Sequence, residues 1–287
     1  MEKKYTGPLR FAHMGMNQIA PANTLPAYQA AYDFGCEAIE CDINMSKDGE
    51  IIMVHDKHLT RYTCGHPTNF STAYIRDLTV EELKQFELPY ACHLMPEKLP
   101  KHSIIERIGS NLPNVVGDYR EAYKTEPRMA HFSTLPEFNE WLKGKDMTVE
   151  VEFKVPGMMK RFVEVTAGTE NIGKYICFTG DREVLSDMQA FIKREGKPEG
   201  LRMGANIRWL TDEIKELIKP YDLFEVGLNA EDYGKDEVKY LNDRGIQVLS
   251  NLGDDPSWWE QICQNGTLGF KTNYVKAFTD WWMETKA

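Results

Sequence analysis

Acidic side chains occur in closely spaced pairs within two apolar segments of the chain. Glu40 and Asp42 are separated by one residue, and so are Glu150 and Glu152, with Lys154 two positions further on. Residues two apart in an extended strand share one face, so each set projects to the same side. Carboxylates held side by side repel one another unless a positive charge lies between them. Because an all-oxygen ligand set favours Mg²⁺ or Ca²⁺ over zinc, these acids are candidate ligands of a divalent ion.

Two of the seven histidines stand at the ends of apolar segments. His13 ends the segment that begins at Leu9, and His55 ends the segment that begins at Glu50. Imidazoles titrate near neutral pH, so two of them can serve as a general acid and a general base. A single histidine is more often a hydrogen-bonded structural residue, and it is the coincidence of two histidines with the acids that favours a site. The other histidines occupy an irregular stretch and are interpreted as structural: His58, His66, His93, His102 and His131.

Short β-type segments alternate with helical patterns along most of the chain. The predicted strands begin near residues 9, 37, 147, 175, 200, 223, 246 and 268, and a helical pattern follows nearly every one. This alternation is typical of βα units around a parallel sheet. Eight such units predict an α/β protein with the TIM (β/α)8 barrel fold, in which chemistry lies at the carboxyl ends of the strands. A doubly wound sheet also alternates, but no glycine-rich phosphate loop follows the first strand.

Two stretches are extra to the eight units. The turn-forming residues 47–49 lead into 50–55, which is predicted to form a hairpin arm with the strand before it. The stretch from about 57 to 146 is too long for a plain loop and is predicted to be a subdomain inserted between the second and third barrel units. Within it, Thr79–Phe86 is predicted to be a helix that begins with a capping box. Residues 1–287 are therefore interpreted as one barrel domain, although length alone suggests two.

Composition excludes several classes of protein. The chain carries 34 Lys and Arg against 44 Asp and Glu, a formal net charge of −10, and it has no basic cluster. A protein that binds nucleic acid through the phosphate backbone needs such a cluster, so we expect no nucleic-acid partner. No window approaches the roughly 18 uninterrupted apolar residues of a transmembrane segment. The oligomeric state is left open.

The cysteines and the first residues bear on the compartment. The six cysteines form no CxxC pair and show no zinc-ligand spacing, so we interpret them mostly as buried small apolar residues rather than disulfides. The first ten residues lack the basic and then apolar pattern of a secretion signal. We therefore expect a cytoplasmic protein, or a periplasmic or secreted one if a leader was removed upstream.

Several short motifs occur along the chain in a fixed order. They are Ala12-His13-Met14-Gly15, Pro21-Ala22-Asn23-Thr24-Leu25, Ile39-Glu40-Cys41-Asp42, Lys47-Asp48-Gly49, Val54-His55-Asp56, Leu59-Thr60-Arg61 and Val151-Glu152-Phe153-Lys154. Taken together they resemble one family, the glycerophosphodiester phosphodiesterases. The resemblance is strong over about 9–62 and 147–154 and weak in the C-terminal half. It implies a metal-dependent TIM-barrel enzyme of lipid metabolism that hydrolyses a small glycerophosphodiester-like substrate to an alcohol and a phosphomonoester.

The resemblance also implies roles for individual residues. Glu40, Asp42 and Glu152 would bind the divalent ion, Mg²⁺ or Ca²⁺. His13 and His55 would be the general acid/base pair, and Lys154 would hold the phosphate. Asp56 is interpreted as orienting local backbone or a neighbouring side chain. These roles suit the chemistry, because the charge of a phosphodiester must be neutralised while one imidazole takes a proton and the other supplies one.

The chain departs from the family pattern at two neighbouring motifs and in the late strands. Met14 replaces an Arg and Ala22 replaces a Glu. We hypothesise that these positions contact each other or a shared ligand, so that the two charges were lost together. The family's Trp-Thr-Val-Asn is Leu249-Ser250-Asn251-Leu252 here, and its Thr-Asp-x-Pro is Thr272-Asn273-Tyr274-Val275. These changes spare the proposed metal and acid/base residues but remodel the pocket wall, so the alcohol group recognised is left open.

Two alternatives stay open. A catalytically weak relative that binds phosphorylated glycans or lipid head groups would fit the lost Arg and the altered late strands, although it would have little use for two acid/base imidazoles. An enzyme that forms a cyclic phosphate by internal hydroxyl attack would use the same two histidines. Product analysis distinguishes this reaction from direct hydrolysis.

Overall fold

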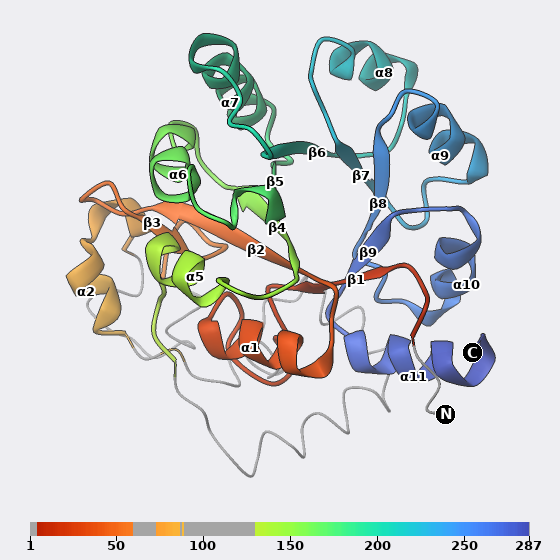
Figure 1. Ribbon diagram of the computed structural model, residues 1–287, viewed down its shortest axis with the longest axis horizontal. Helices are drawn as coiled ribbons and strands as arrows, with labels where there is room; N and C mark the ends of the chain where they lie inside the picture. Colours follow the sequence, from red (N-terminus) through yellow and green to blue (C-terminus); the bar gives the residue numbers. More distant parts are fainter. Residues whose placement is uncertain (1–4, 60–72, 87, 89–129, 287) are drawn as a thin grey trace.

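Eight parallel strands form a closed barrel. The computed structural model describes residues 5–59, 73–86, 88 and 130–286. The barrel strands are β1 (Leu9–His13), β2 (Ala38–Met45), β4 (Thr148–Phe153), β5 (Tyr175–Phe178), β6 (Arg202–Arg208), β7 (Glu225–Asn229), β8 (Gln247–Asn251) and β9 (Gly269–Thr272). Because β1 pairs with both β2 and β9, the ring closes on itself (Figure 1). The predicted TIM-barrel fold is confirmed.

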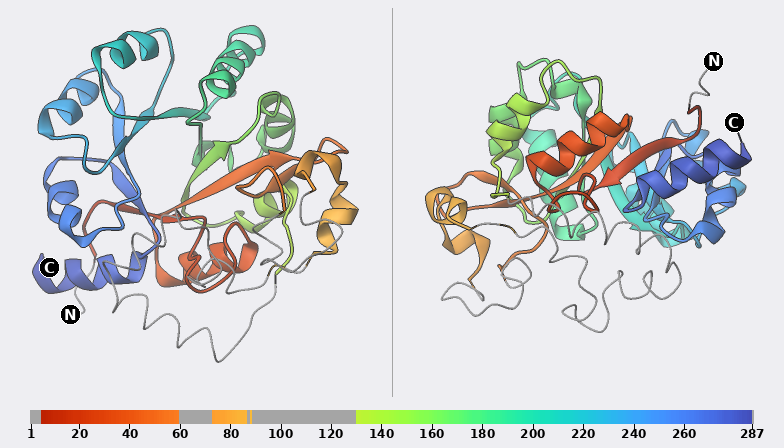
Figure 2. Two further views of the ribbon diagram at one scale, coloured as in Figure 1. Left: turned by 180° about the vertical axis from the view of Figure 1, so that it is seen from behind. Right: turned by 90° about the horizontal axis from the view of Figure 1, so that it is seen from below.

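Helices surround the barrel on its outer side, as both views of Figure 2 show. They are α1 (Leu25–Phe34), α5 (Leu135–Trp141), α6 (Met159–Thr166), α7 (Arg182–Glu195), α8 (Asp212–Ile218), α9 (Lys235–Asn242), α10 (Pro256–Gln264) and α11 (Val275–Thr285). Several begin at a side chain that accepts a hydrogen bond from the first turn, as Asp181 does for α7 and Thr211 for α8. The sequence patterns did not predict α5. Its capping box of Thr134 and Glu137 is the signal that could have located it.

The strand β3 (Ile51–Met53) is extra to the barrel and pairs antiparallel with β2, which confirms the predicted hairpin arm. Its outer edge is covered, because the Met53 N–H donates to the Ser133 carbonyl at 2.8 Å and Ile52 forms a bridge with Thr134. Beyond β3, a 3₁₀ turn (Ile75–Asp77) precedes the helix α2 (Val80–Lys84), and a second 3₁₀ turn (Ile172–Lys174) precedes β5. The capping box predicted for α2 is present.

Alternation along the strands separates the core from the site. On β2, the side chains of Ile39, Cys41 and Ile43 join the main hydrophobic core with residues of the surrounding helices. Glu40 and Asp42 therefore face the barrel interior. A separate apolar cluster of Phe11, Ala38 and Leu249 lies nearer the amino ends of the strands. Polar groups are thus gathered toward the carboxyl ends.

Arg10 joins the first strand to the last helix. Its guanidinium forms an ion pair with Glu37 at 2.7 Å, donates to the Gly35 carbonyl at 2.6 Å and donates to Thr279 Oγ1 at 2.8 Å. Thr279 belongs to α11, so one buried side chain ties the β1–α1 unit to the C-terminal helix. The N-terminal and C-terminal units lie side by side in consequence (Figure 1).

Some predictions concern residues outside those described. They are the Thr60 and Arg61 of one motif, the cysteines Cys64 and Cys92, the histidines His66, His93 and His102, and most of the predicted insertion. Of the described cysteines, Cys36, Cys41 and Cys177 are buried, Cys263 is half-buried, and all four are free thiols, as expected. Among the described residues, no helix combines the length and apolarity needed to cross a lipid bilayer.

Candidate active site

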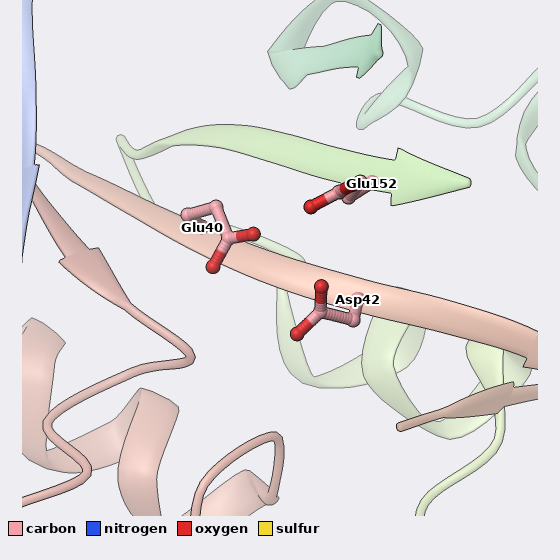
Figure 3. A group of neighbouring side chains, drawn as sticks. All are labelled: Glu40, Asp42 and Glu152. Carbon is pink, nitrogen blue, oxygen red and sulfur yellow. The ribbon is translucent and has the colours of Figure 1, made fainter. Parts of the chain in front are cut away.

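Three carboxylates converge at one side of the barrel mouth. In the parallel pairing of β2 and β4, Asp42 lies opposite Glu152, and in the pairing of β1 and β2, His13 lies opposite Glu40. Glu40, Asp42 and Glu152 each offer an oxygen, and these oxygens all lie within 4.8 Å of one another (Figure 3). Glu40 and Asp42 are almost fully buried, whereas the Glu152 side chain keeps 20% of its surface exposed. The cluster is therefore sunk into the barrel but open on the Glu152 side.

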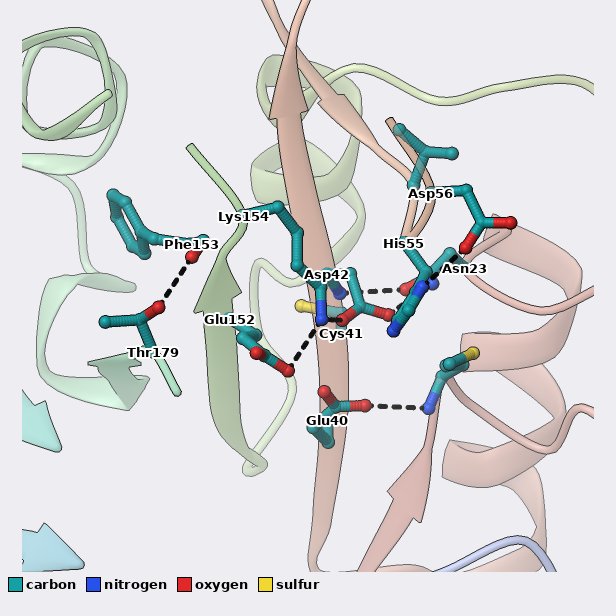
Figure 4. A network of polar contacts seen from close by, with 12 residues as sticks. Asn23, Glu40, Cys41, Asp42, His55, Asp56, Glu152, Phe153, Lys154 and Thr179 are labelled. Atoms are coloured by element: carbon teal, nitrogen blue, oxygen red, sulfur yellow. Dashed lines mark hydrogen bonds and ion pairs between the residues drawn. The ribbon is translucent and has the colours of Figure 1, made fainter. Parts of the chain in front are cut away.

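The ammonium group of Lys154 lies between two of these acids. Its Nζ is 2.8 Å from Asp42 Oδ1 and 2.8 Å from Glu152 Oε2 (Figure 4). Burial alone would raise the pKa of Asp42, but Lys154 holds it below the usual range. Burial likewise would lower the pKa of Lys154, and the two carboxylates raise it instead. One lysine thus neutralises part of a cluster of three acids.

The ion pairs of Lys154 involve Asp42 and Glu152, and Glu40 is the third acid of the cluster. Burial raises the pKa of Glu40 well above its ordinary value, and the neighbouring Asp42 raises it further. A divalent cation would relieve both effects, because it stabilises carboxylates as anions. Three oxygen donors converging from two adjacent strands fit Mg²⁺ or Ca²⁺.

Asn23 holds Asp42 from the side opposite Lys154. Its Nδ2 donates to Asp42 Oδ2 at 2.8 Å, and its Oδ1 accepts from the Asp42 backbone N–H at 2.9 Å (Figure 4). The same Oδ1 accepts from the Tyr28 hydroxyl at 3.0 Å. Asn23 adopts a left-handed backbone with φ of 60°. Asparagine tolerates this conformation better than most residues. Asn23 belongs to one of the motifs that resemble the family, but its type and position alone predicted no role for it.

The positions where the chain departs from the family pattern lie next to this cluster. The Met14 N–H donates to Glu40 Oε2 at 3.1 Å, and the Met14 carbonyl accepts from the Asn23 N–H at 3.0 Å. Asn23 directly follows Ala22, so the backbones around Met14 and Ala22 run side by side, and both side chains are buried. This geometry agrees with the hypothesis that the two positions are neighbours. Their joint exchange remains a prediction.

His55 and Asp56 follow β3, and the His55 side chain lies close to Asp42. Asp56 Oδ1 is 2.7 Å from His55 Nδ1 (Figure 4). The loop is held by Asn44 of β2, whose Nδ2 donates to the carbonyls of Val54 and His55 at 3.0 and 3.2 Å. Asp56 therefore contacts a neighbouring side chain, as interpreted from the sequence. The His55 side chain is 35% exposed, which leaves it accessible from outside.

His13 is the more buried of the two imidazoles. Its Nδ1 lies 2.8 Å from Asn273 Oδ1, and its Nε2 lies 3.9 Å from Glu40 Oε2. Burial lowers the pKa of His13 to about 4, so the ring is neutral near pH 7. A neutral imidazole with one nitrogen facing the acids is suited to accept a proton.

Glu150 faces the barrel interior, as its spacing predicts, but it belongs to a second cluster. Its Oε1 accepts from Lys271 Nζ at 2.8 Å, and the Lys271 ammonium lies 4.0 Å from the centre of the Phe178 ring. Burial raises the pKa of both Glu150 and its neighbour Glu225. The side chains of Glu150, Glu225 and Lys271 are all buried. Strand spacing alone could not separate Glu150 from the candidate metal ligands.

The residues that the sequence singled out therefore meet in one place. His13 ends β1, Glu40 and Asp42 lie within β2, Glu152 and Lys154 lie at and just after the end of β4, and His55 lies in the loop after β3. Both imidazoles are close enough to Asp42 to lower its pKa electrostatically. Two of the histidines interpreted as structural have structural contacts: His58 forms a β-bridge with Tyr74, and His131 Nδ1 hydrogen bonds to the Phe86 carbonyl.

Comparison with known proteins gives a consistent set of relatives. The model of the glycerophosphoryl diester phosphodiesterase family matches residues 13–277. The chain is 30% identical over 104 residues to the glycerophosphodiester phosphodiesterase of Caldanaerobacter subterraneus subsp. tengcongensis, a match that covers 35% of this chain but only 40% of that protein. The glycerophosphodiester phosphodiesterase of Bacillus subtilis (strain 168) is 28% identical over 283 residues, which is 94% of this chain and 85% of the relative.

A solved structure shares the fold along almost the whole length. It is an Oleispira antarctica phosphodiesterase in complex with the product sn-glycerol-3-phosphate. The two folds agree with a TM-score of 0.70 at 19% identity, over 96% of each chain.

Proposed function

This chain belongs to the glycerophosphoryl diester phosphodiesterase family, and from that premise we propose that it hydrolyses a glycerophosphodiester to an alcohol and a phosphomonoester. The observation that carries the proposal is the convergence of Glu40, Asp42 and Glu152 beside the neutral ring of His13. The product named for the Oleispira structure, sn-glycerol-3-phosphate, suggests glycerol phosphate as the phosphomonoester. We further propose that residues 1–287 form one barrel domain with an insertion at about 57–146.

The metal dependence is part of the proposal. Glu40, Asp42 and Glu152 would hold a Mg²⁺ or Ca²⁺ ion, which when bound supplies positive charge and Lewis acidity at the phosphodiester. The fit is supported by the crowding of three carboxylates around Lys154, because burial and the charge of Asp42 raise the pKa of Glu40 even though Lys271 acts against them. Asn23 Nδ2 donates a hydrogen bond to Asp42, and the Met14 N–H donates one to Glu40. The two buried acids are therefore held in place before any ligand arrives.

The two imidazoles have different surroundings, and this suggests different roles. His13 is neutral and its Nε2 faces the acids, so we assign it the general base that takes the proton of the attacking water. His55 Nδ1 lies 2.7 Å from the Asp56 carboxylate, which orients the ring, so we assign His55 the general acid that protonates the leaving alkoxide. The exposure of His55 suits a group that meets the departing alcohol.

Lys154 is assigned to the phosphate. Its ammonium group already lies among the acids at the open side of the cluster, where an anionic diester would bring its charge. A lysine there supplies a compact positive charge to a non-bridging oxygen and stabilises the charge that grows in the transition state.

An assay with several head groups tests the function. Glycerophosphodiesters carrying choline, ethanolamine, inositol and glycerol would be incubated with Mg²⁺, with Ca²⁺ and with EDTA, and the products identified. We expect metal-dependent release of the alcohol together with a phosphomonoester. A cyclic phosphate product would instead identify internal hydroxyl attack. No turnover of any diester with either metal would contradict hydrolysis and favour a protein that only binds such groups.

A further inference from the structure

A buried carboxylate, that of Asp254, is linked to His13 through one intervening residue, Asn273. Asp254, in the loop after β8, is buried and accepts three hydrogen bonds. Its Oδ1 accepts from the Thr272 hydroxyl at 2.8 Å and from the Asn273 backbone N–H at 2.7 Å, and its Oδ2 accepts from Asn273 Nδ2 at 2.6 Å. Burial raises the pKa of Asp254, while three donated hydrogen bonds favour its ionised form. Asp254 thus fixes both the backbone and the side chain of Asn273.

The contact with Asp254 determines which way the Asn273 amide points. A carboxylate accepts hydrogen bonds and has none to donate, so the NH₂ group of Asn273 must face Asp254. The carbonyl oxygen, Oδ1, then faces the site. It accepts from Asn17 Nδ2, which also donates to the His13 carbonyl at 3.0 Å. Two separate partners, Asp254 and Asn17, therefore impose the same orientation on this amide.

The orientation of the amide in turn determines the tautomer of His13. Asn273 Oδ1 lies 2.8 Å from His13 Nδ1, and a carbonyl oxygen can only accept, so Nδ1 must carry the hydrogen. In the neutral ring Nε2 then has no hydrogen, and its lone pair faces Glu40 at 3.9 Å, on the side of the candidate metal cluster. This is the form that a general base needs.

We propose that Asp254 and Asn273 are positioning residues that hold His13 as the Nδ1–H tautomer, with Nε2 ready to accept a proton. The inference rests on the function proposed for His13, and it extends that function to two loops far along the chain. It also gives Asn273 a reason to be an amide. An aspartate at position 273, as the resembled family pattern has, would place a second carboxylate 2.6 Å from the first.

Exchanging the two residues provides the test. In Asp254→Asn the new NH₂ group faces that of Asn273, so the Asn273 amide must turn over and present its own NH₂ group to His13 Nδ1. In Asn273→Asp two carboxylates face each other. In the double variant Asp254→Asn/Asn273→Asp every hydrogen bond can form again. The amide introduced at position 254 keeps a carbonyl oxygen for Thr272 and donates its NH₂ group to the carboxylate introduced at position 273. Only the position of the negative charge changes.

Two readouts separate positioning from simple structural support. The ring nitrogens of His13 are followed by ¹⁵N NMR of histidine-labelled protein, assigned with His13→Ala, and the turnover of the best diester is measured as kcat and KM. Asp254→Asn should shift His13 toward the Nε2–H form and lower kcat by about 10- to 100-fold, with little change in KM. The double variant should return His13 to the Nδ1–H form and recover most of kcat. Glu225→Gln, a carboxylate-to-amide change at another buried site, should change neither readout.

The outcomes are distinct. If Asp254→Asn keeps His13 in the Nδ1–H form with wild-type kcat, or if the double variant is no better than the single ones, the inference is wrong. If Asp254→Asn fails to fold, Asn273→Ala answers the same question, because it removes the acceptor of Nδ1 and should give mixed tautomers and a similar loss of kcat. If the wild type hydrolyses no diester, the proposed function fails, while the NMR readout still decides whether Asp254 and Asn273 set the tautomer.

Discussion

Two lysines inside this barrel contact carboxylates at the same distance but in very different surroundings. In the mouth cluster, formed by Asp42, Glu152 and Lys154, the lysine Nζ lies 2.8 Å from each acid, and Lys154 and Glu152 keep 13% and 20% of their side-chain surface exposed. In the sealed cluster, formed by Glu150, Glu225 and Lys271, the lysine lies 2.8 Å from Glu150, and these two side chains keep only 5% and 1% exposed.

The two clusters contain the same types of side chain and differ in solvent exposure. Exposure therefore distinguishes a cluster that can bind a ligand from one that only stabilises the barrel. Glu150 and Glu152 are two residues apart on one strand and face the same way, yet only Glu152 can meet a ligand that comes from outside. An ion pair open to solvent can exchange one cation for another. A sealed pair cannot, because removing either partner leaves a buried charge without compensation.

The largest expected effect concerns the two imidazoles, which serve the mouth cluster but not the sealed one. His13→Ala or His55→Ala should lower kcat by about 10²- to 10⁴-fold, the usual contribution of a positioned acid or base. Metal binding, measured by calorimetry or by metal-dependent thermal stabilisation, should persist, since no proposed ligand is removed. Wild-type turnover of every diester by either variant would contradict the acid/base assignment.

The same substitution at the two lysines should have different consequences. Lys154→Met should lower kcat by about 10²- to 10³-fold, as the loss of one transition-state donor does. It should also lower the unfolding free energy, because the buried Asp42 loses its ammonium partner, but by less than Lys271→Met does, because Lys154 and Glu152 are partly exposed to solvent. Lys271→Met should lower the unfolding free energy by about 3–5 kcal/mol, because Glu150 and Glu225 lose their counter-charge. Urea unfolding and steady-state kinetics of both variants provide the measurement. Equal stability losses would mean that the two clusters do not differ as described.

The neighbouring glutamates allow a narrower comparison. Glu152→Gln should abolish metal-dependent activity together with the stabilisation that metal confers, which is about 2.7 kcal/mol when the free metal is at 100 times its Kd. Glu150→Gln should keep the stabilisation by metal, because its side chain lies outside the ligand set. Thermal unfolding with Mg²⁺, with Ca²⁺ and with EDTA distinguishes the two. Loss of metal stabilisation in Glu150→Gln would extend the metal site into the sealed cluster.

The smallest effect is a pH dependence within the sealed cluster. Burial raises the pKa of Glu225 in the folded protein, so the folded state binds more protons than the unfolded chain does. The stability that this proton confers is complete below the ordinary pKa of glutamate and is lost as the pH rises through the raised value. Glu225→Gln cannot titrate. It should stay within about 1 kcal/mol of wild type near pH 5 and gain on it toward pH 9. The unfolding free energies of both proteins would be measured by urea unfolding at several pH values. The same pH dependence in both would show that Glu225 keeps an ordinary pKa.

Most of the fold was predictable because its signals are local. Each barrel strand is a short apolar run, and each helix except α5 has a clear periodic pattern. The helix α5 has seven residues, as α8 has, and was missed because it directly follows the long irregular stretch and its capping box was not used as a helix signal. The spacing of Glu40 and Asp42 also predicted correctly that both side chains face one side.

The partners of the site residues were not predictable, because they come from segments that only the closed barrel brings together. Lys271 is 121 residues from Glu150, and Asn273 is 260 residues from His13. Lys271 lies in β9 and Asn273 directly follows it, so both reach the site only because β9 pairs with β1. No regular sequence spacing links either residue to its partner. Asn23 is a different case. Its motif is visible in the sequence, but its contact with Asp42 is visible only in the structure.

The first strand, β1, depends on the last part of the chain for one neighbouring strand and for a partner of Arg10, and this has a consequence for synthesis of the protein. The guanidinium in β1 binds Thr279, which is 269 residues further along the chain, and β1 has no second neighbouring strand until β9 has been made. At about 5–20 residues per second, the ribosome needs on the order of tens of seconds between these two points. During that time one edge of the first strand is unpaired, and His13 at its end has no Asn273. The nascent chain therefore completes the support of this histidine only when its last βα unit has emerged.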